Sequence, residues 1–187
     1  PLSQTAARRV IETACSYSTL EYNVAEKRRG SRQDHVESLL CKITGAEAAF
    51  AVNNNAAATM LVLSSMTNGR PVIVSRGELV EIGGSFRIPD IMELSGAILK
   101  EVGTTNKTRL SDYADAIDPE RTAALMKIHT SNYHIVGFTE DVPLRPLKEL
   151  GEKFSLPVIY DIGSGLLLDL KEQGIRLISF DIDDTIN

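Results

Sequence analysis

Short apolar segments that recur along the chain, each followed by a helical pattern, constrain its fold more than any other feature. The predicted strands are residues 48–52, 71–74, 98–102, 123–128, 157–160 and 177–180. These segments are continuously apolar rather than alternating, which is typical of strands buried on both faces of a parallel sheet. The sequence therefore predicts an α/β fold of three layers, in which a mainly parallel sheet has helices on both faces.

Stretches with helical periodicity fill the gaps between these segments. The predicted helices are residues 5–16, 36–43, 56–65, 88–94, 110–117 and 144–154, with a weaker helical pattern at 21–26. No internal repeat, low-complexity tract or Pro/Gly/Ser-rich linker interrupts the alternation, so one continuous unit is predicted.

Composition excludes several classes of protein. The 187 residues are 43% hydrophobic but only 5% aromatic, so the predicted core is aliphatic. A net charge of -5 gives no general attraction for a polyanion, and any nucleic-acid contact must be local. Without an apolar stretch of about 18 residues or a basic, hydrophobic leader, the chain is predicted to be cytoplasmic, with no membrane contact. Cys15 and Cys41 lack metal-site spacing and are predicted to be buried, reduced thiols.

The residues at two of the predicted strand ends are suited to bind a phosphate and a cation, respectively. Ligands bind at the carboxyl ends of strands in such sheets. Asn54, Asn55 and Ala56 follow the first predicted strand and open a helix, where free N–H groups suit a phosphate, although plain capping by asparagine explains them equally well. Asp161 ends the fifth strand, where a buried acid needs a cationic partner such as a protonated pyridine nitrogen, or else caps the next turn.

The other strand ends give weaker signals. Arg76 and Arg87, with two nearby glutamates, shape a pocket for a charged substrate or pair on the surface, and surface pairing is favoured. His129 and Asn132 follow the fourth strand, where a histidine can stack on a ring but is more often structural.

Several strings, spread in order over about residues 1–174, carry a resemblance to one family. They are Arg28-Arg29-Gly30-Ser31-Arg32 with Asp34-His35, Thr44-Gly45-Ala46-Glu47-Ala48, Asn53-Asn54-Asn55-Ala56-Ala57-Ala58, Ser75-Arg76-Gly77-Glu78-Leu79-Val80-Glu81-Ile82-Gly83-Gly84, Glu101-Val102-Gly103-Thr104-Thr105-Asn106, His129-Thr130-Ser131-Asn132-Tyr133 and Asp161-Ile162-Gly163-Ser164-Gly165. Together they resemble bacterial selenocysteine synthase, the L-seryl-tRNA(Sec) selenium transferase family.

The resemblance implies a fold-type I enzyme with pyridoxal 5'-phosphate as cofactor. It implies that Asp161 pairs with the pyridine nitrogen and that the turn at Asn54 receives the cofactor phosphate. The residues it implies for the cofactor are Asn54, Asn55, Ala56, His129, Asp161 and Ser164. The residues it suggests for the substrate are Arg28, Arg29, Arg32, Arg76 and Asn132, of which the basic string can also be a solvated loop paired with Glu26 or Glu37.

The implied reaction converts seryl-tRNA(Sec) to selenocysteinyl-tRNA(Sec) with selenophosphate, through an aldimine of pyridoxal phosphate. The family's homo-oligomers imply the same association here. A related pyridoxal-phosphate lyase or transferase acting on a small amino acid is the nearest alternative. A truncated paralogue without catalysis is the other.

The sequence departs from the family towards its end. The family's Schiff-base lysine, in a Ser-Phe-Ser-Gly-Asp-Lys string, has no counterpart here, because the last lysine is Lys171. The family's tRNA-binding amino-terminal domain also has no counterpart. The chain is therefore expected to be a truncated large-domain core, residues 1–174, with a divergent tail, residues 175–187, and to be inactive alone. Asp181, Asp183 and Thr185 in that tail resemble the haloacid-dehalogenase phosphatase signature, although a chance acidic end is preferred.

Overall fold

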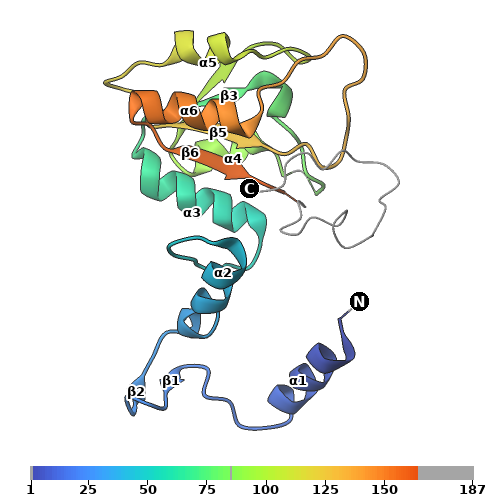
Figure 1. Ribbon diagram of the computed structural model, residues 1–187, viewed down its shortest axis with the longest axis vertical. Helices are drawn as coiled ribbons and strands as arrows, with labels where there is room; N and C mark the ends of the chain where they lie inside the picture. The colour runs from blue at the N-terminus through green and yellow to red at the C-terminus, as the bar shows by residue number, and fades with distance from the viewer. Residues whose placement is uncertain (1, 85, 164–187) are drawn as a thin grey trace. The chain divides into compact units, whose positions relative to one another are not determined.

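The computed structural model describes residues 2–84 and 86–163, and the chain divides into two compact units, residues 1–51 and 52–187 (Figure 1). The second unit holds the sheet. Its strands are β3 (Pro71–Ser75), β4 (Ile98–Val102), β5 (Ala124–Ile128) and β6 (Val158–Asp161). They are parallel and lie in the order β4-β3-β5-β6. The sequence predictions for these four strands are confirmed, whereas the predicted strand 177–180 lies outside the described residues.

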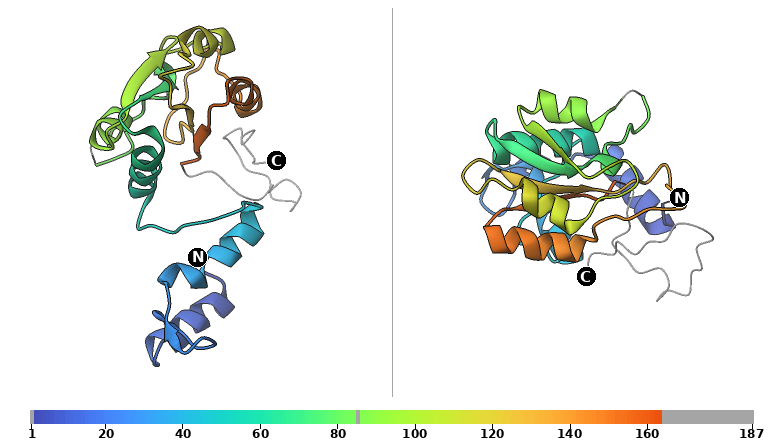
Figure 2. Two further views of the ribbon diagram at one scale, coloured as in Figure 1. Left: turned by 90° about the vertical axis from the view of Figure 1, so that its left-hand side faces the viewer. Right: turned by 90° about the horizontal axis from the view of Figure 1, so that it is seen from above.

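Helices cover both faces of this sheet, which confirms the predicted three-layer architecture (Figures 1 and 2). Side chains of alternating strand residues enter two separate clusters, as the pleat requires. Val72, Val74 and Met126 pack with α3 (Asn55–Thr67) and α4 (Ile88–Leu94). Ile73 and Leu125 pack on the other face with α5 (Leu110–Ala116) and α6 (Leu144–Phe154).

The order of the strands reverses between β3 and β5, because the chain runs from β3 outward to β4 and then returns to β5. A buried tyrosine bridges the two strands there. The Tyr113 hydroxyl accepts a hydrogen bond from the Ser75 N–H at 2.9 Å and donates one to the Met126 carbonyl at 3.2 Å. Burial raises the pKa of Tyr113 above its ordinary value, so the hydroxyl stays protonated as a donor.

The loops that follow β3 and β4 touch each other. The loop after β3 begins with η2 (Arg76–Glu78), and a Cβ atom on Gly77 would lie 2.7 Å from the Thr105 carbonyl oxygen. Since real Cβ atoms do not approach a carbonyl so closely, only glycine fits at this position without moving one of the two loops.

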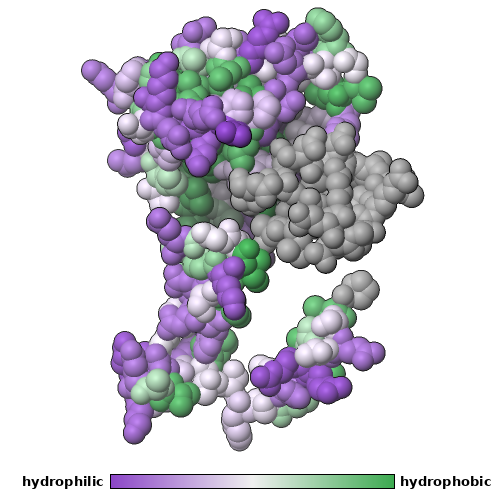
Figure 3. Space-filling view, in the orientation of Figure 1, coloured by the Kyte–Doolittle hydropathy of each residue, from purple (hydrophilic) through white to green (hydrophobic). Residues whose placement is uncertain are grey.

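The first unit has regular elements but no buried residue. Its elements are α1 (Gln4–Ala14), β1 (Tyr22–Asn23), β2 (Arg28–Arg29), η1 (Arg32–His35) and α2 (Glu37–Thr44). No side chain of residues 2–51 is buried. Large apolar side chains such as Ile11 and Ile43 are at least 60% exposed, and Figure 3 shows hydrophobic atoms at the surface of this unit among hydrophilic ones.

The predicted strand 48–52 is not a strand. The N–H and C=O of Ala51 bond the side chain of Gln33, each at 2.9 Å, so a glutamine amide takes the place of a neighbouring strand. No strand of the described structure pairs with this apolar run, so the prediction of a strand here was wrong.

The weak helical pattern at 21–26 was also misleading. The side chain of Asn23 accepts hydrogen bonds from the N–H groups of Ala25 and Glu26, both at 3.1 Å, and turns the chain back so that β1 pairs with β2. Asparagine favours such turns over helix because its side chain competes for backbone N–H groups.

The two cysteines are free, as predicted, but Cys15 is exposed and Cys41 half-buried, so the prediction that they are buried was wrong.

Candidate functional site

The carboxylate of Asp161 is the centre of the site. It ends β6, is 7% exposed and points at the first turns of α3. Its Oδ1 accepts hydrogen bonds from Asn55 Nδ2 at 2.8 Å and from the Gly163 N–H at 2.9 Å, and its Oδ2 accepts one from Thr59 Oγ1 at 3.1 Å. These three donors are neutral, so they orient the carboxylate without cancelling its charge. Of the two lone pairs on Oδ2, they use one.

The beginning of α3 lies beside this carboxylate. Asn54 caps the helix, and its side-chain oxygen accepts a hydrogen bond from the Ala57 N–H at 2.9 Å. The N–H groups of Asn55 and Ala56 precede the first intrahelical hydrogen bond, and the helix dipole adds partial positive charge there. Capping by Asn54 is confirmed, and it leaves the following two N–H groups suited to an anion, so phosphate binding at this turn stays a prediction.

The ends of β5 and β6 bring the backbone of His129 beside the backbone of Asp161. The backbone N–H of His129 donates to the Asp161 carbonyl at 2.9 Å, which continues the pairing of the two strands. Gly163 then turns the chain with a positive φ of 52°, a conformation that strains other residues and that lets its N–H reach Oδ1 of Asp161. Ser164, which the sequence also placed here, lies outside the described residues.

A buried ion pair at the reversal of strand order was missed from sequence. Lys127 Nζ lies 3.1 Å from Glu78 Oε1, and the N–H of Ile128 donates to Glu78 Oε2 at 3.0 Å. Both residues are less than 7% exposed. Burial raises the pKa of Glu78, while Lys127 and the Ile128 N–H oppose that rise. One signal was present in the sequence, a lysine within an otherwise apolar strand, because such a lysine requires a buried counter-charge.

Lys127 and Asp161 lie on opposite faces of the sheet. Lys127 alternates along β5 with Met126 and Ile128, which belong to the α3–α4 cluster, so its side chain leaves on the α5–α6 face. Asp161, in contrast, contacts α3. Lys127 is therefore not placed to react with a molecule bound beside Asp161.

The predicted substrate residues at the strand ends are engaged in local contacts. Arg76 pairs with Glu101 at 2.8 Å, and both side chains are more than a third exposed. Asn132 Nδ2 donates to the Glu81 carbonyl at 2.8 Å. Arg87 pairs with Glu81 at 2.7 Å on the surface, which raises the pKa of the guanidinium through the hydrogen bond to Glu81.

The three arginines of the basic string lie in the first unit, and each has a glutamate partner. Arg28 pairs with Glu26, while Arg29 and Arg32 share Glu21. The hydrogen bond from Arg32, followed by that from Arg29, lowers the pKa of Glu21. One of the expected partners, Glu26, is thus confirmed, and Glu21 takes the place of Glu37.

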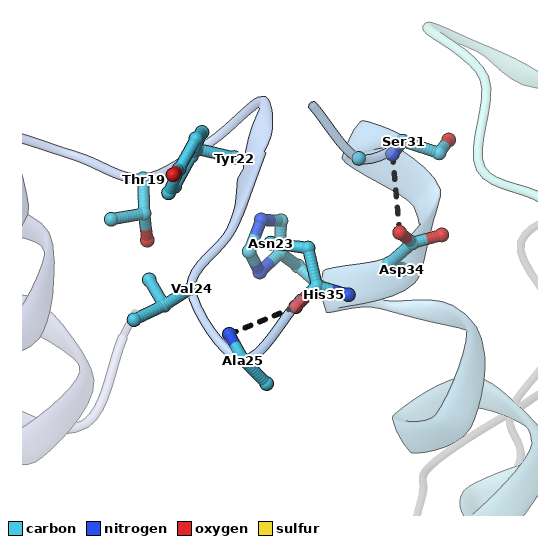
Figure 4. Close-up of a pocket in the computed structure, with 9 residues that line it drawn as sticks. Thr19, Tyr22, Asn23, Val24, Ala25, Ser31, Asp34 and His35 are labelled. Atoms are coloured by element: carbon cyan, nitrogen blue, oxygen red, sulfur yellow. Dashed lines mark hydrogen bonds between the residues drawn. The ribbon is translucent and has the colours of Figure 1, made fainter. Parts of the chain in front are cut away.

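A hollow of about 360 Å³ lies in the first unit, lined by nine residues around the β1–β2 turn (Figure 4). Its polar side chains already serve the local chain. Asn23 accepts from Ala25, Asp34 accepts from the Ser31 N–H at 3.1 Å, and His35 Nε2 lies 3.1 Å from the Leu20 carbonyl.

Two kinds of feature are absent from the described residues. These hold no cluster of three or more His, Cys, Asp or Glu side chains suited to a metal ion. They also contain no helix with the length and apolarity needed to cross a membrane. The acidic tail motif at Asp181, Asp183 and Thr185 lies outside the described residues and stays a prediction.

Comparison with known protein families shows to which family this chain belongs. The family described as SelA, L-seryl-tRNA selenium transferase, matches residues 1–181. The chain belongs to this family. Two L-seryl-tRNA(Sec) selenium transferases illustrate the similarity: that of Aquifex aeolicus is 56% identical over the whole chain, and that of Alkaliphilus metalliredigens 59% identical over 93% of it. The chain spans only 41% and 37% of the lengths of these relatives.

Solved structures show which fold this chain shares. D-glucosaminate-6-phosphate ammonia-lyase gives a TM-score of 0.64 with 18% identity, over 85% of this chain and 43% of its own. 3-Amino-5-hydroxybenzoic acid synthase gives 0.56 with 20% identity, over 87% of this chain and 38% of its own. At this level of identity they show the fold alone, which is that of the fold-type I pyridoxal-phosphate-dependent transferases, as the sequence predicted.

Proposed function

We propose that this chain forms the cofactor-binding core of an L-seryl-tRNA(Sec) selenium transferase, which converts seryl-tRNA(Sec) to selenocysteinyl-tRNA(Sec) with selenophosphate. The observation that carries the proposal is the buried Asp161 carboxylate beside the start of α3. A negative group and an anion-binding helix start, close together, match the two ends of pyridoxal 5'-phosphate.

The residues fit the cofactor in charge and in hydrogen bonding. The unused lone pair of Asp161 Oδ2 can accept a hydrogen bond from the N–H of a protonated pyridine ring. Because the three donors already bound to Asp161 are neutral, its negative charge can pair with the positive charge of that ring. The N–H groups of Asn55 and Ala56 would hold the phosphate, and His129 would border the ring. When bound, the cofactor supplies an electron sink for loss of a proton beside the amino group. Asp161 keeps that sink effective by holding the ring nitrogen protonated.

The substrate residues complete the proposal. Arg28, Arg29, Arg32 and Arg76 would bind phosphate groups of the tRNA end or of selenophosphate, with Asn132 as a further hydrogen-bonding group. Each of these arginines is paired with a glutamate that is exposed or half-buried, so a phosphate would compete with that glutamate. Such exposed pairs are weak, and arginine binds phosphate with two parallel hydrogen bonds.

Binding of pyridoxal phosphate to the whole chain tests the proposal. Asp161→Asn should weaken binding by about 10- to 100-fold, because a hydrogen bond to a charged group contributes about 1.5–3 kcal/mol. Asp115→Asn, an exposed aspartate on α5, is the matched control and should leave the affinity unchanged. Equilibrium dialysis gives both values. Equal affinity for all three proteins, or no binding by the unaltered chain, would contradict the proposal.

The substrate class is tested separately. The unaltered chain should bind seryl-tRNA(Sec) in preference to free serine, and replacing Arg28 and Arg29 together by alanine should lower both that affinity and its dependence on salt. A preference for a free amino acid would favour the related lyase or transferase instead.

A further inference from the structure

We propose that Asn55 and Thr59 of α3 are positioning residues that aim the Asp161 carboxylate at the ring nitrogen, so that one helix fixes both ends of the cofactor. This rests on the proposed function. The helix start would hold the phosphate, and the same face one turn later holds the group that meets the nitrogen.

The geometry shows why α3 can do this. Asn55 and Thr59 are four residues apart and therefore lie on the same face of the helix. Asn55 reaches Oδ1 of Asp161 at 2.8 Å and Thr59 reaches Oδ2 at 3.1 Å, so each carboxylate oxygen has a donor on this face. Two donors on two oxygens fix the plane of the carboxylate, which one donor alone leaves free to rotate.

The side chain of Asn55 is consequently committed to Asp161. Its backbone N–H remains available at the helix start, while the side-chain amide is directed at the carboxylate. Thr59 is 6% exposed, so water does not readily replace its hydroxyl if that hydroxyl is removed. Loss of either donor leaves a buried carboxylate oxygen with fewer hydrogen bonds and a freer orientation.

A second buried threonine on the same helix supplies a matched control. Thr67, the last residue of α3, is fully buried, and its hydroxyl has no hydrogen-bond partner among the described residues. Threonine-to-valine changes at positions 59 and 67 replace the same hydroxyl by the same methyl group in the same helix. Only the change at 59 removes a bond to Asp161.

The experiment compares two ligands, pyridoxal phosphate and its 1-deaza analogue, in which a carbon replaces the ring nitrogen. Their affinity ratio reports the contact at the nitrogen, because both carry the same phosphate. The unaltered chain should bind pyridoxal phosphate at least about tenfold more tightly than the analogue. Thr59→Val and Asn55→Ala should each lower this ratio by about threefold or more, towards the value for Asp161→Asn.

The controls separate positioning from general damage to the fold. Thr59→Ser keeps the hydroxyl and should restore the ratio, and Thr67→Val should leave it unchanged. A ratio that Thr59→Val does not alter, or alters no more than Thr67→Val does, would overturn the positioning role even if the unaltered chain binds the cofactor. No binding of either ligand by the unaltered chain would instead overturn the proposed function, and the positioning role with it.

Discussion

The two units of this chain both contain helices and strands, but they differ in how far the apolar side chains of these elements are buried. In the second unit, strand residues such as Val72 and Leu125 are completely buried between helices. In the first, the helices are equally well formed, yet Leu39 and Val10 are each 58% exposed. Helical periodicity thus produced helices in both units, but only the sheet provided a surface on which apolar side chains are buried. Local pattern and tertiary stabilisation are separate properties, and sequence periodicity reports the first.

The largest difference between the units should come from the buried ion pair. Lys127→Met should destabilise the second unit by about 4 kcal/mol, because it leaves the Glu78 carboxylate buried without its cation. Lys148→Met is the control, since Lys148 lies in an exposed pair on α6, where Figure 3 shows a hydrophilic surface, and should cost less than about 1 kcal/mol. Urea unfolding measures both, and equal effects would contradict a special role for the buried pair.

The pH dependence of that variant sharpens the prediction. Burial raises the pKa of Glu78, and removing Lys127 removes the strongest effect that opposes the rise. A group whose pKa is raised by folding stabilises the fold while protonated and loses that contribution as pH rises through its folded pKa. The cost of Lys127→Met should therefore be smaller near pH 4 than near pH 7. A cost that grows on acidification would show that Glu78 is not the group left uncompensated.

A pair of leucines compares the units directly. Leu63 on α3 is fully buried, and Leu63→Ala should lower the stability of the second unit by about 3 kcal/mol through lost packing and the cavity left behind. Leu39→Ala on α2 makes the same change at an exposed position and should cost less than about 0.5 kcal/mol. Hydrogen exchange read peptide by peptide reports each unit separately. Comparable losses at the two positions would mean that Leu39 is buried in solution.

The smallest effect is expected in the hairpin of the first unit. Glu21→Gln removes the shared partner of Arg29 and Arg32, and hydrogen exchange should accelerate in β2 and η1 alone. The pKa of Glu21 is lowered by these arginines, so the stabilisation is present at neutral pH and is lost as pH falls through the folded pKa. Glu47→Gln, at an exposed position, is the control. A change that spreads to α3 would contradict a purely local role.

The four strands of the sheet could be predicted from sequence because each is itself a short apolar segment, recognisable without knowledge of its neighbours. The four strands at 71–75, 98–102, 124–128 and 158–161 are apolar, and the helices between them are amphipathic. The segment 48–52 shows the limit of that signal. The residues there are apolar, but strand formation needs a neighbouring strand, and here the side chain of Gln33 binds the backbone of Ala51 instead. Which segment pairs with which is a property of the whole fold.

The site was predictable in part for the same reason. Asp161 and the asparagines were predicted as site residues from their places at a strand end and at a helix start, and the structure shows both of these places. The bonds from Asn55 and Thr59 to Asp161 join residues more than 100 positions apart and could not be found that way. Glu78 and Lys127, 49 positions apart, were missed likewise, although a lysine in an apolar strand indicates that some partner exists.

The contact between Gly77 and Thr105 makes the shape of each of the two loops depend on the other. Because the backbone of one rests on the backbone of the other, an insertion or a bulkier residue in either must be matched by a change in its neighbour. The two loops after β3 and β4 are therefore expected to tolerate sequence changes only in combination, unlike loops that share no such backbone contact.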